Sequence, residues 1–265
     1  MPLWDDSARQ YDAFEKKWYH YEKIAKGLLK ELDICDLSNV LELASGTGAC
    51  SKLLGTISTK GRITGIDSSP EMVRFSRENM RVSGFSNISY FVGDVSELAN
   101  IFPQIKFDVV VCNSAFWHFP DLSKVSRDVH SLLNPGGQFG FNITQWFTSD
   151  DARNIFRKKV REILEGRGLD LPESGTLRNQ TRDYHEILDN AGFSEIREVS
   201  YEFEATRQML NEWHEIPAFS DQFRSSKYPQ DVIDEIRREF EKVENPSQNL
   251  RTSRWKIFTA KKTPK

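Results

Sequence analysis

Three acidic residues stand at or near the ends of short apolar runs, and they are the first candidates for chemistry in this chain. Glu42 lies within VLEL, Asp67 ends RITGID, and Asp94 follows YFVG. Runs of this kind are typical of buried β-strands. An acid at the position of Asp67 can accept hydrogen bonds from both hydroxyls of a ribose. Asp94 can accept one from an adenine amine, with capping of the next helix as the alternative role.

A turn of small residues, ASGTG, follows the first of these runs and opens a helical stretch. Gly46 and Gly48 let the backbone approach a ligand closely, and the helix amino terminus offers free N–H groups. The turn departs from the dinucleotide fingerprint GxGxxG, because Ser51 stands where the third glycine belongs and Glu42 would repel a pyrophosphate. We therefore expect a positively charged nucleoside, with a nicotinamide dinucleotide as the alternative.

Short apolar runs alternate with helical patterns through the first half of the chain. Strands joined by crossover helices form a parallel sheet with helices on both faces, and such sheets bind ligands at the carboxyl ends of their strands. The predicted fold class is α/β, a doubly wound, mostly parallel seven-stranded sheet. We expect its strands at 39–43, 62–66, 88–92, 107–112, 138–143, 196–204 and 254–262, and the crossover helices at 49–54, 71–82, 95–101 and 122–133.

The remaining segments predict a cap and a lid around this sheet. An apolar stripe from Tyr11 to Leu32 at helical spacing predicts one long amino-terminal helix, within a helical cap at 1–38. The core is expected at 39–265. The alternation of strands and helices is interrupted at about 145–181 and 207–254, where helical patterns predict lid insertions.

Charge and composition bear on the class of partner. The net charge of −3 gives no general attraction for a polyanion, so we expect no nucleic-acid partner. Three cysteines without a C-x-x-C spacing indicate neither a zinc site nor a disulfide framework, which favours a cytoplasmic protein. The start MPLWDDSARQ has no signal-peptide pattern, and no window reaches the roughly 18 apolar residues that span a bilayer, so we expect no membrane partner.

The motifs, in their order, resemble those of class I S-adenosylmethionine-dependent methyltransferases. The resemblance covers residues 40–144 and is carried by LELASGTG, GIDSSPEMV, GDVSEL, FDVVVCNSAFWHF and LLNPGGQF. The family usually has glycine where Ala44 stands. The methyl group of the alanine slightly narrows the room beside a cofactor. The resemblance implies a Rossmann-like fold and a transferase that uses S-adenosylmethionine and leaves S-adenosylhomocysteine.

The resemblance also implies the positions that bind the cofactor. Glu42 would favour the ammonium or sulfonium charge, and Asp67 would hold the ribose. Asp94 would accept from the adenine amine, and the N–H of Val95 would reach a ring nitrogen. The other positions are Ala44, Gly46 and Gly48 along the methionine part, Ser68 and Met72 on the adenine side, and Asn113 and Ser114 beside the sulfonium.

Methyl transfer from a sulfonium is an in-line displacement in which the protein mainly aligns the reacting groups. His118, in FWHF, is a candidate base for an acceptor that arrives protonated, with packing among aromatic residues as the alternative. Tyr11 and Tyr19 resemble amino-terminal aromatic residues that cover the methyl donor in small-molecule members of the family, and Tyr11 fits plain packing equally well. Asp150 and Asp151 could ligate magnesium, but helix capping explains them more simply, so no metal is expected.

The acceptor is expected to be a small organic molecule, methylated at O, N or C. After the fourth strand the chain lacks the NPP[YFW] turn with which other methyltransferases hold a planar amide or amine. Aromatic residues in the two lid blocks favour an enclosed apolar pocket. A protein or RNA acceptor is the first alternative, and a non-catalytic S-adenosylmethionine-binding protein is the second.

Overall fold

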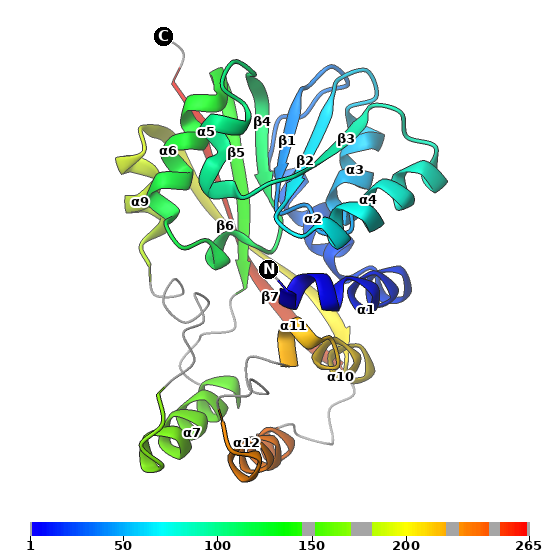
Figure 1. The fold of residues 1–265 in the computed structure, drawn as a ribbon. Coiled ribbons are helices and arrows are strands. Elements are labelled where there is room, and N and C mark those ends of the chain that lie inside the picture. The colour runs from blue at the N-terminus through cyan, green and yellow to red at the C-terminus, as the bar shows by residue number, and fades with distance from the viewer. Residues whose placement is uncertain (1, 145–151, 171–181, 221–227, 244–249, 264–265) are drawn as a thin grey trace.

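The computed structural model describes residues 2–144, 152–170, 182–220, 228–243 and 250–263, and its centre is a seven-stranded sheet (Figure 1). The strand order is β3-β2-β1-β4-β5-β7-β6. The first five strands are parallel, and β7 is antiparallel to β5 and β6. This confirms the predicted fold class. The strands are β1 (Val40–Leu43), β2 (Ile63–Asp67), β3 (Ile88–Val92), β4 (Phe107–Cys112), β5 (Leu133–Thr144), β6 (Phe193–Thr206) and β7 (Leu250–Lys262).

Helices cover both faces of this sheet (Figure 1). On one face, α5 (Leu98–Ile101), α6 (Leu122–Leu132) and α9 (Tyr184–Asn190) pack against a buried apolar core that includes Val110 and Cys112 of β4. On the other face, α2 (His20–Lys30) and α3 (Ala49–Ile57) pack against a second core that includes Val109 and Val111. Successive side chains of a strand point to opposite faces, so β4 supplies both cores and its apolar run is continuous.

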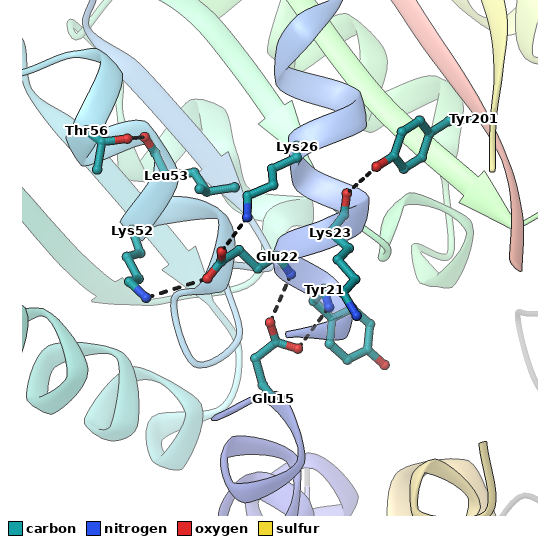
Figure 2. A network of polar contacts seen from close by, with 9 residues as sticks. All are labelled: Glu15, Tyr21, Glu22, Lys23, Lys26, Lys52, Leu53, Thr56 and Tyr201. Carbon is teal, nitrogen blue, oxygen red and sulfur yellow. Dashed lines mark hydrogen bonds and ion pairs between the residues drawn. The ribbon is translucent and has the colours of Figure 1, made fainter. Parts of the chain in front are cut away.

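The predicted amino-terminal helix is in fact two helices, α1 (Pro2–Trp18) and α2. The break falls at Tyr19, whose φ of 51° lies in the left-handed region. Glu15 supports the break, because its carboxylate accepts hydrogen bonds from the N–H groups of Tyr21 (2.8 Å) and Glu22 (2.9 Å) in the first turn of α2 (Figure 2). The apolar stripe passes through the break, so its periodicity did not reveal two helices.

Figure 2 also shows how α2 is held between its neighbours. The carboxylate of Glu22 pairs with Lys26 Nζ (2.8 Å) and with Lys52 Nζ of α3 (3.5 Å). The hydroxyl of Tyr201, on β6, donates to the carbonyl oxygen of Lys23 at 3.0 Å. These contacts fix α2 to α3 and to the sheet. Helix α1 joins this fixed helix at Tyr19.

The two predicted lid blocks each contribute a helix to one small pair. Helix α7 (Ala152–Gly166) lies beside α12 (Gln230–Val243), away from the sheet (Figure 1). Arg167, just after α7, pairs with Asp231 (2.7 Å) and Glu235 (3.1 Å). The second block also contains α10 (Arg207–His214) and α11 (Pro217–Ser220), which contact α1. The residues buried between α7 and α12 are Val160, Leu164, Val232 and Ile236.

Within the described ranges, no helix combines the length and the apolar character needed to cross a lipid bilayer.

Candidate active site

The glycine turn joins β1 to α3 in backbone conformations that favour glycine. Ala44, Gly46 and Gly48 have φ angles of 49°, 53° and 93°. The left-handed angle at Ala44 gives a physical reason why glycine is common at this position in the resembling family. The N–H of Ser45 donates to the carbonyl oxygen of Ile66 at 3.0 Å, which places the turn beside the end of β2.

Asp67, at the end of β2, connects this turn to the next helix. Its carboxylate accepts hydrogen bonds from Gly46 N (2.8 Å) and from Ser69 N (2.9 Å). Ser69 is also the N-cap of α4 (Pro70–Ser83), because its hydroxyl accepts from Met72 N at 3.1 Å. Burial raises the pKa of Asp67 even though both hydrogen bonds favour the carboxylate. Asp67 therefore organises two backbone segments as well as offering its remaining lone pairs to a ligand.

Glu42 lies in β1 directly below the turn and is almost entirely buried. Its side chain accepts a hydrogen bond from the hydroxyl of Ser51 in α3. Burial raises the pKa of Glu42 to about 8, and the nearby charge of Asp67 adds to the rise. A lone Glu42 is thus mainly protonated at neutral pH, and a neighbouring positive charge would favour its ionised form.

The predicted adenine-side residues lie around the ends of β2 and β3. Asp94 is exposed, and its side chain accepts from Ser96 N at 2.8 Å as the N-cap of η1 (Val95–Glu97). Val95 and Met72 are buried, and Ser68 is half-buried. The capping alternative for Asp94 is therefore present in the structure, and the carboxylate keeps further acceptor capacity on its exposed side.

At the end of β4, an amide network fixes Asn113 and Ser114. Asn142 Nδ2, from β5, donates to Asn113 Oδ1 at 2.7 Å, and Asn142 Oδ1 accepts from Ser114 N at 2.7 Å. Asn113 Nδ2 in turn donates to the carbonyl oxygen of Tyr21 at 3.1 Å. Ser114 has a φ of 59°, and its buried Oγ has no hydrogen-bond partner among the described residues. Asn142 thus holds the loop that carries Asn113 and Ser114, the two positions predicted to lie beside the sulfonium.

Helix α1 is attached to both segments that carry the predicted cofactor positions. Asp5 accepts from Ser69 Oγ at 2.5 Å and from Glu71 N at 3.2 Å, at the start of α4. Further along α1, Asp12 Oδ1 accepts from Asn79 Nδ2 at 2.7 Å, and the same amide donates to the carbonyl oxygen of Thr47 in the glycine turn at 2.9 Å. The amino-terminal helix therefore lies over the carboxyl ends of β1 and β2.

Aromatic side chains gather where α1 meets α2 and α10. The rings of Tyr11 and Tyr21 are stacked, with centroids 4.8 Å apart, and Trp213 Nε1 donates to the Tyr21 hydroxyl at 2.8 Å. Tyr11 also borders the turn, since a Cβ built on Gly46 would lie 3.8 Å from its ring. The structure does not bring Tyr19 into this cluster.

Tyr19 instead lies at the break between α1 and α2, on the surface. It is 49% exposed, and Lys52 Nζ lies 5.9 Å from the centre of its ring. Tyr21, two residues later, occupies the position beside Tyr11. The left-handed break at Tyr19 is the reason, because it rotates the start of α2 relative to α1.

His118 ends η2 (Phe116–His118), which follows β4. Its ring meets that of Trp4, from α1, edge to face with centroids 6.0 Å apart, and it also contacts Trp117. Burial lowers the pKa of His118 to about 4, so the imidazole is neutral at physiological pH. This arrangement fits both packing and a role as proton acceptor, the two roles considered for this histidine.

Several residues of this region carried no recognised signal in the sequence. Ser69 could have been found, since serine before proline is typical of a helix start. The others come from segments that only the fold brings together. They are Asp5 and Asp12 of α1, Tyr21 of α2, Asn79 of α4 and Asn142 of β5. The candidate magnesium ligands Asp150 and Asp151 lie outside the described residues.

Comparisons with known proteins agree with the motifs. A family model described as a methyltransferase domain matches residues 35–192. A demethylmenaquinone methyltransferase from Listeria welshimeri is 27% identical over 190 residues, covering 68% of this chain and 80% of that protein.

Solved structures of similar fold include YcgJ from Bacillus subtilis, with a TM-score of 0.60, 16% identity and coverage of 93% of this chain and 100% of that one. Phosphoethanolamine N-methyltransferase 2 from Haemonchus contortus, in complex with S-adenosyl-L-methionine, has a TM-score of 0.58, 17% identity and coverage of 98% and 57%. The family model covers more than half of the chain, and the motifs and the sheet order fit it. The chain belongs to the methyltransferase domain family and is a class I S-adenosylmethionine-dependent methyltransferase.

Proposed function

We propose that this enzyme transfers a methyl group from S-adenosylmethionine to O, N or C of a small organic acceptor. The observation that carries the proposal is the position of Asp67, a buried carboxylate that joins the glycine turn to the start of α4 under the amino-terminal helix. A carboxylate with two occupied lone pairs and two remaining ones suits the vicinal hydroxyls of a ribose.

The residues around Asp67 fit the proposed cofactor. Among the described residues, a Cβ added to Gly46 would meet the ring and the hydroxyl of Tyr11, both at the ordinary contact distance of 3.8 Å, which leaves room for a ligand beside the backbone. The buried Ser114 Oγ is available as a hydrogen-bonding group. Glu42 and Asp67 form a buried acidic pair, and no described basic side chain makes an ion pair with either one. A cationic nucleoside would neutralise this pair, whereas a dinucleotide would add negative charge to it.

Each predicted position then has a proposed task. Asp67 and Glu42 bind the ribose and the positively charged part of the donor, and Asp94 receives the adenine amine on its exposed side. When bound, S-adenosylmethionine supplies the activated methyl group. The chain supplies alignment, and Asn142 contributes by fixing the loop of Asn113 and Ser114. The remaining proposed contacts are those of Ala44, Gly46, Gly48, Ser68, Met72 and Val95.

The cover of the site supports a small acceptor. Helix α1 is bonded to α4 and, through Asn79, to the glycine turn, and residues 1–38 are proposed as a cap on a core at 39–265. The aromatic cluster of Tyr11, Tyr21, Trp4 and His118 offers neutral, mainly apolar surface. The similarity to a demethylmenaquinone methyltransferase also supports a small organic acceptor. The blocks at about 145–181 and 207–254 are proposed as the lid.

The proposal is tested by incubating the protein with methyl-labelled S-adenosylmethionine and separate small-molecule, protein and RNA fractions of a cell extract. We expect label in the small-molecule fraction. Label only in protein or RNA would support the first alternative, and binding of the donor without any labelled product would support a non-catalytic protein.

Asp67→Ala provides the matched test of the site. We expect it to weaken S-adenosylhomocysteine binding by about 1–3 kcal/mol, through loss of charge-assisted hydrogen bonds to the ribose. Calorimetry measures this change directly. Asp36→Ala is the control, because Asp36 is an exposed aspartate that pairs with Lys60 on the surface. Equal affinity in wild type and Asp67→Ala would remove Asp67 from this role.

A further inference from the structure

Aromatic side chains form a closed circuit between the two amino-terminal helices and the sheet. Each ring contacts the next one around the circuit, with centroids 4.8–6.5 Å apart, and the last ring contacts the first. The rings come from α1, α2, η2 and β7, which only the fold brings together. In order around this aromatic circuit, they are those of Trp4, Tyr11, Tyr21, His20, Trp255, Trp117 and His118.

The aromatic circuit lies next to the proposed donor site. Tyr11 borders the glycine turn, since a Cβ built on Gly46 would lie 3.8 Å from its ring. On the other side, η2 follows the loop that Asn142 holds at the end of β4. Trp4, Tyr11 and His118 are half-buried, whereas the other four rings are buried. The circuit therefore has an accessible side, and that side includes the ring that borders the turn.

Thr144 adds a hydrogen-bonding group beside the aromatic circuit. Thr144 of β5 stands opposite Trp255 of β7 in the antiparallel register, so the two side chains are neighbours on one face of the sheet. Its Oγ1 is buried and has no hydrogen-bond partner among the described residues. A buried hydroxyl without a partner costs free energy. A ligand that supplies the missing hydrogen bond is therefore favoured at this position.

The charges near the aromatic circuit favour an acceptor without net charge. Burial raises the pKa of the Tyr11 hydroxyl, and the charges of Glu15 and Asp67 add to the rise, so both acids lie close to the circuit. A negatively charged acceptor would be repelled by these acids. A positively charged acceptor would be repelled by the sulfonium of the donor, and each of the two carboxylates already accepts two backbone N–H groups. An uncharged acceptor avoids both costs.

We propose that the aromatic circuit and Thr144 bind the methyl acceptor, and that this acceptor is an uncharged aromatic molecule with a hydroxyl group. The inference rests on the proposed function and narrows its class of acceptor. A planar aromatic molecule makes stacked and edge-to-face contacts with tyrosine, tryptophan and histidine rings. Its hydroxyl group forms the hydrogen bond that Thr144 Oγ1 lacks within the described chain.

The class of acceptor is tested by isothermal titration calorimetry at neutral pH on protein saturated with S-adenosylhomocysteine, so that only the acceptor site is open. Three probes share the naphthalene ring and differ in charge: naphthol is neutral, naphthoate is negative and naphthylmethylammonium is positive. We expect naphthol to bind at least about tenfold more tightly than either charged probe, because a charge here is desolvated without a partner. Equal or tighter binding of a charged probe would overturn the assigned class.

The role of Thr144 is tested with Thr144→Val, which removes the hydroxyl and keeps the shape of the side chain. We expect naphthol binding to weaken about two- to twelvefold, the equivalent of one hydrogen bond, while the affinity for S-adenosylhomocysteine stays the same. Methylnaphthalene has no hydroxyl group, so its binding should not fall in Thr144→Val. Thr56→Val is the control, because Thr56 is exposed on α3. Unchanged naphthol binding in Thr144→Val would remove Thr144 from the site.

The role of the aromatic circuit is tested with Trp4→Leu, which removes a half-buried ring of α1. We expect both naphthol and methylnaphthalene to bind about two- to twelvefold more weakly, since both lose an aromatic contact. Phe91→Leu removes an exposed ring of β3 and should bind both probes as wild type does. Unchanged binding of both probes in Trp4→Leu would overturn the circuit as the acceptor site. If Trp4→Leu does not fold, Thr144→Val with the two probes still decides the question.

The outcomes separate this inference from the proposed function. Failure of wild type to bind S-adenosylhomocysteine would overturn the proposed function itself. Normal binding of S-adenosylhomocysteine without any binding of naphthol would overturn only the assigned acceptor.

Discussion

Asp5 and Asp67 are joined through a single serine. Ser69 donates its hydroxyl hydrogen to Asp5 Oδ1 at 2.5 Å and its backbone N–H to Asp67 Oδ1 at 2.9 Å. Asp5 lies in α1, and Asp67 ends β2, 62 residues later in the chain. Helix α1 is therefore bonded to Ser69, and Ser69 positions Asp67, the residue proposed to bind the ribose.

Loss of this link should loosen the cover over the site. Asp5→Ala removes the hydrogen bonds from Ser69 and Glu71. We expect S-adenosylhomocysteine binding to weaken about two- to twelvefold, the equivalent of one hydrogen bond of roughly 0.5–1.5 kcal/mol. Hydrogen exchange should become faster in α1 and remain unchanged in β4. Asp6→Ala is the control, since Asp6 is the exposed neighbour of Asp5. Unchanged exchange in α1 of Asp5→Ala would show that Asp5 does not hold the helix.

If His118 is the proton acceptor, its imidazole should be neutral before it takes the proton throughout the range around neutral pH. Burial lowers its pKa to about 4, so its neutral form dominates above that pH and is lost only as the pH falls through about 4. We expect turnover at saturating donor to show no inflection near pH 6.5. His118→Ala should reduce turnover more than cofactor affinity.

The control for His118 is His185→Ala. His185 is exposed and lies beside Glu198 of β6, far along the sheet from the proposed site. Equal turnover in wild type and His118→Ala would assign His118 to packing with Trp4 and Trp117.

The two amino-terminal tyrosines should differ in their effect on catalysis. Tyr11 borders the glycine turn and stacks on Tyr21, whereas Tyr19 lies on the surface beside Lys52. We expect Tyr11→Phe to reduce kcat more than Tyr19→Phe, because only Tyr11 presents its hydroxyl to the proposed site. Steady-state kinetics on the two variants decides this. A larger loss in Tyr19→Phe would show that Tyr19 reaches the reacting groups.

Glu15 should make the stability of the protein depend on pH. Burial raises its pKa to about 7, above that of a glutamate in the unfolded chain. A raised pKa in the folded state means that the stability from protonated Glu15 is present at low pH and is lost as the pH rises through about 7. Relative to wild type, Glu15→Gln should therefore gain stability between pH 5 and pH 8.

Denaturant unfolding of both proteins at pH 5 and pH 8 measures this difference. The glutamine also loses part of the cap on α2, but that loss is the same at both pH values. The ionisation of Glu15 is therefore reported by how the difference in unfolding free energy between Glu15→Gln and wild type changes from pH 5 to pH 8. The sign of that difference at a single pH does not report it. An identical difference at pH 5 and pH 8 would show that Glu15 is ionised across this range in the folded protein.

The sequence alone determined the elements that depend on short-range pattern. Apolar runs bounded by glycine, together with crossover helices between them, indicated a mostly parallel sheet, and the order of the motifs indicated the methyltransferase family. Glu42, Asp67 and Asp94 were found because each lies in or just after a strand, and parallel strands bring such positions to one edge of a sheet.

The tertiary structure decided what covers that edge and which charges meet there. The break at Tyr19 is a local left-handed residue inside a continuous apolar stripe, so periodicity did not reveal that Tyr21 and not Tyr19 stacks on Tyr11. Ser69, which bonds to Asp5, and Asn79, which bonds to Asp12, each lie more than sixty residues from their partner in sequence, beyond the reach of any local pattern. The raised pKa of Glu42 depends on burial and on its acidic neighbours, which arise only when the strands and helices pack together.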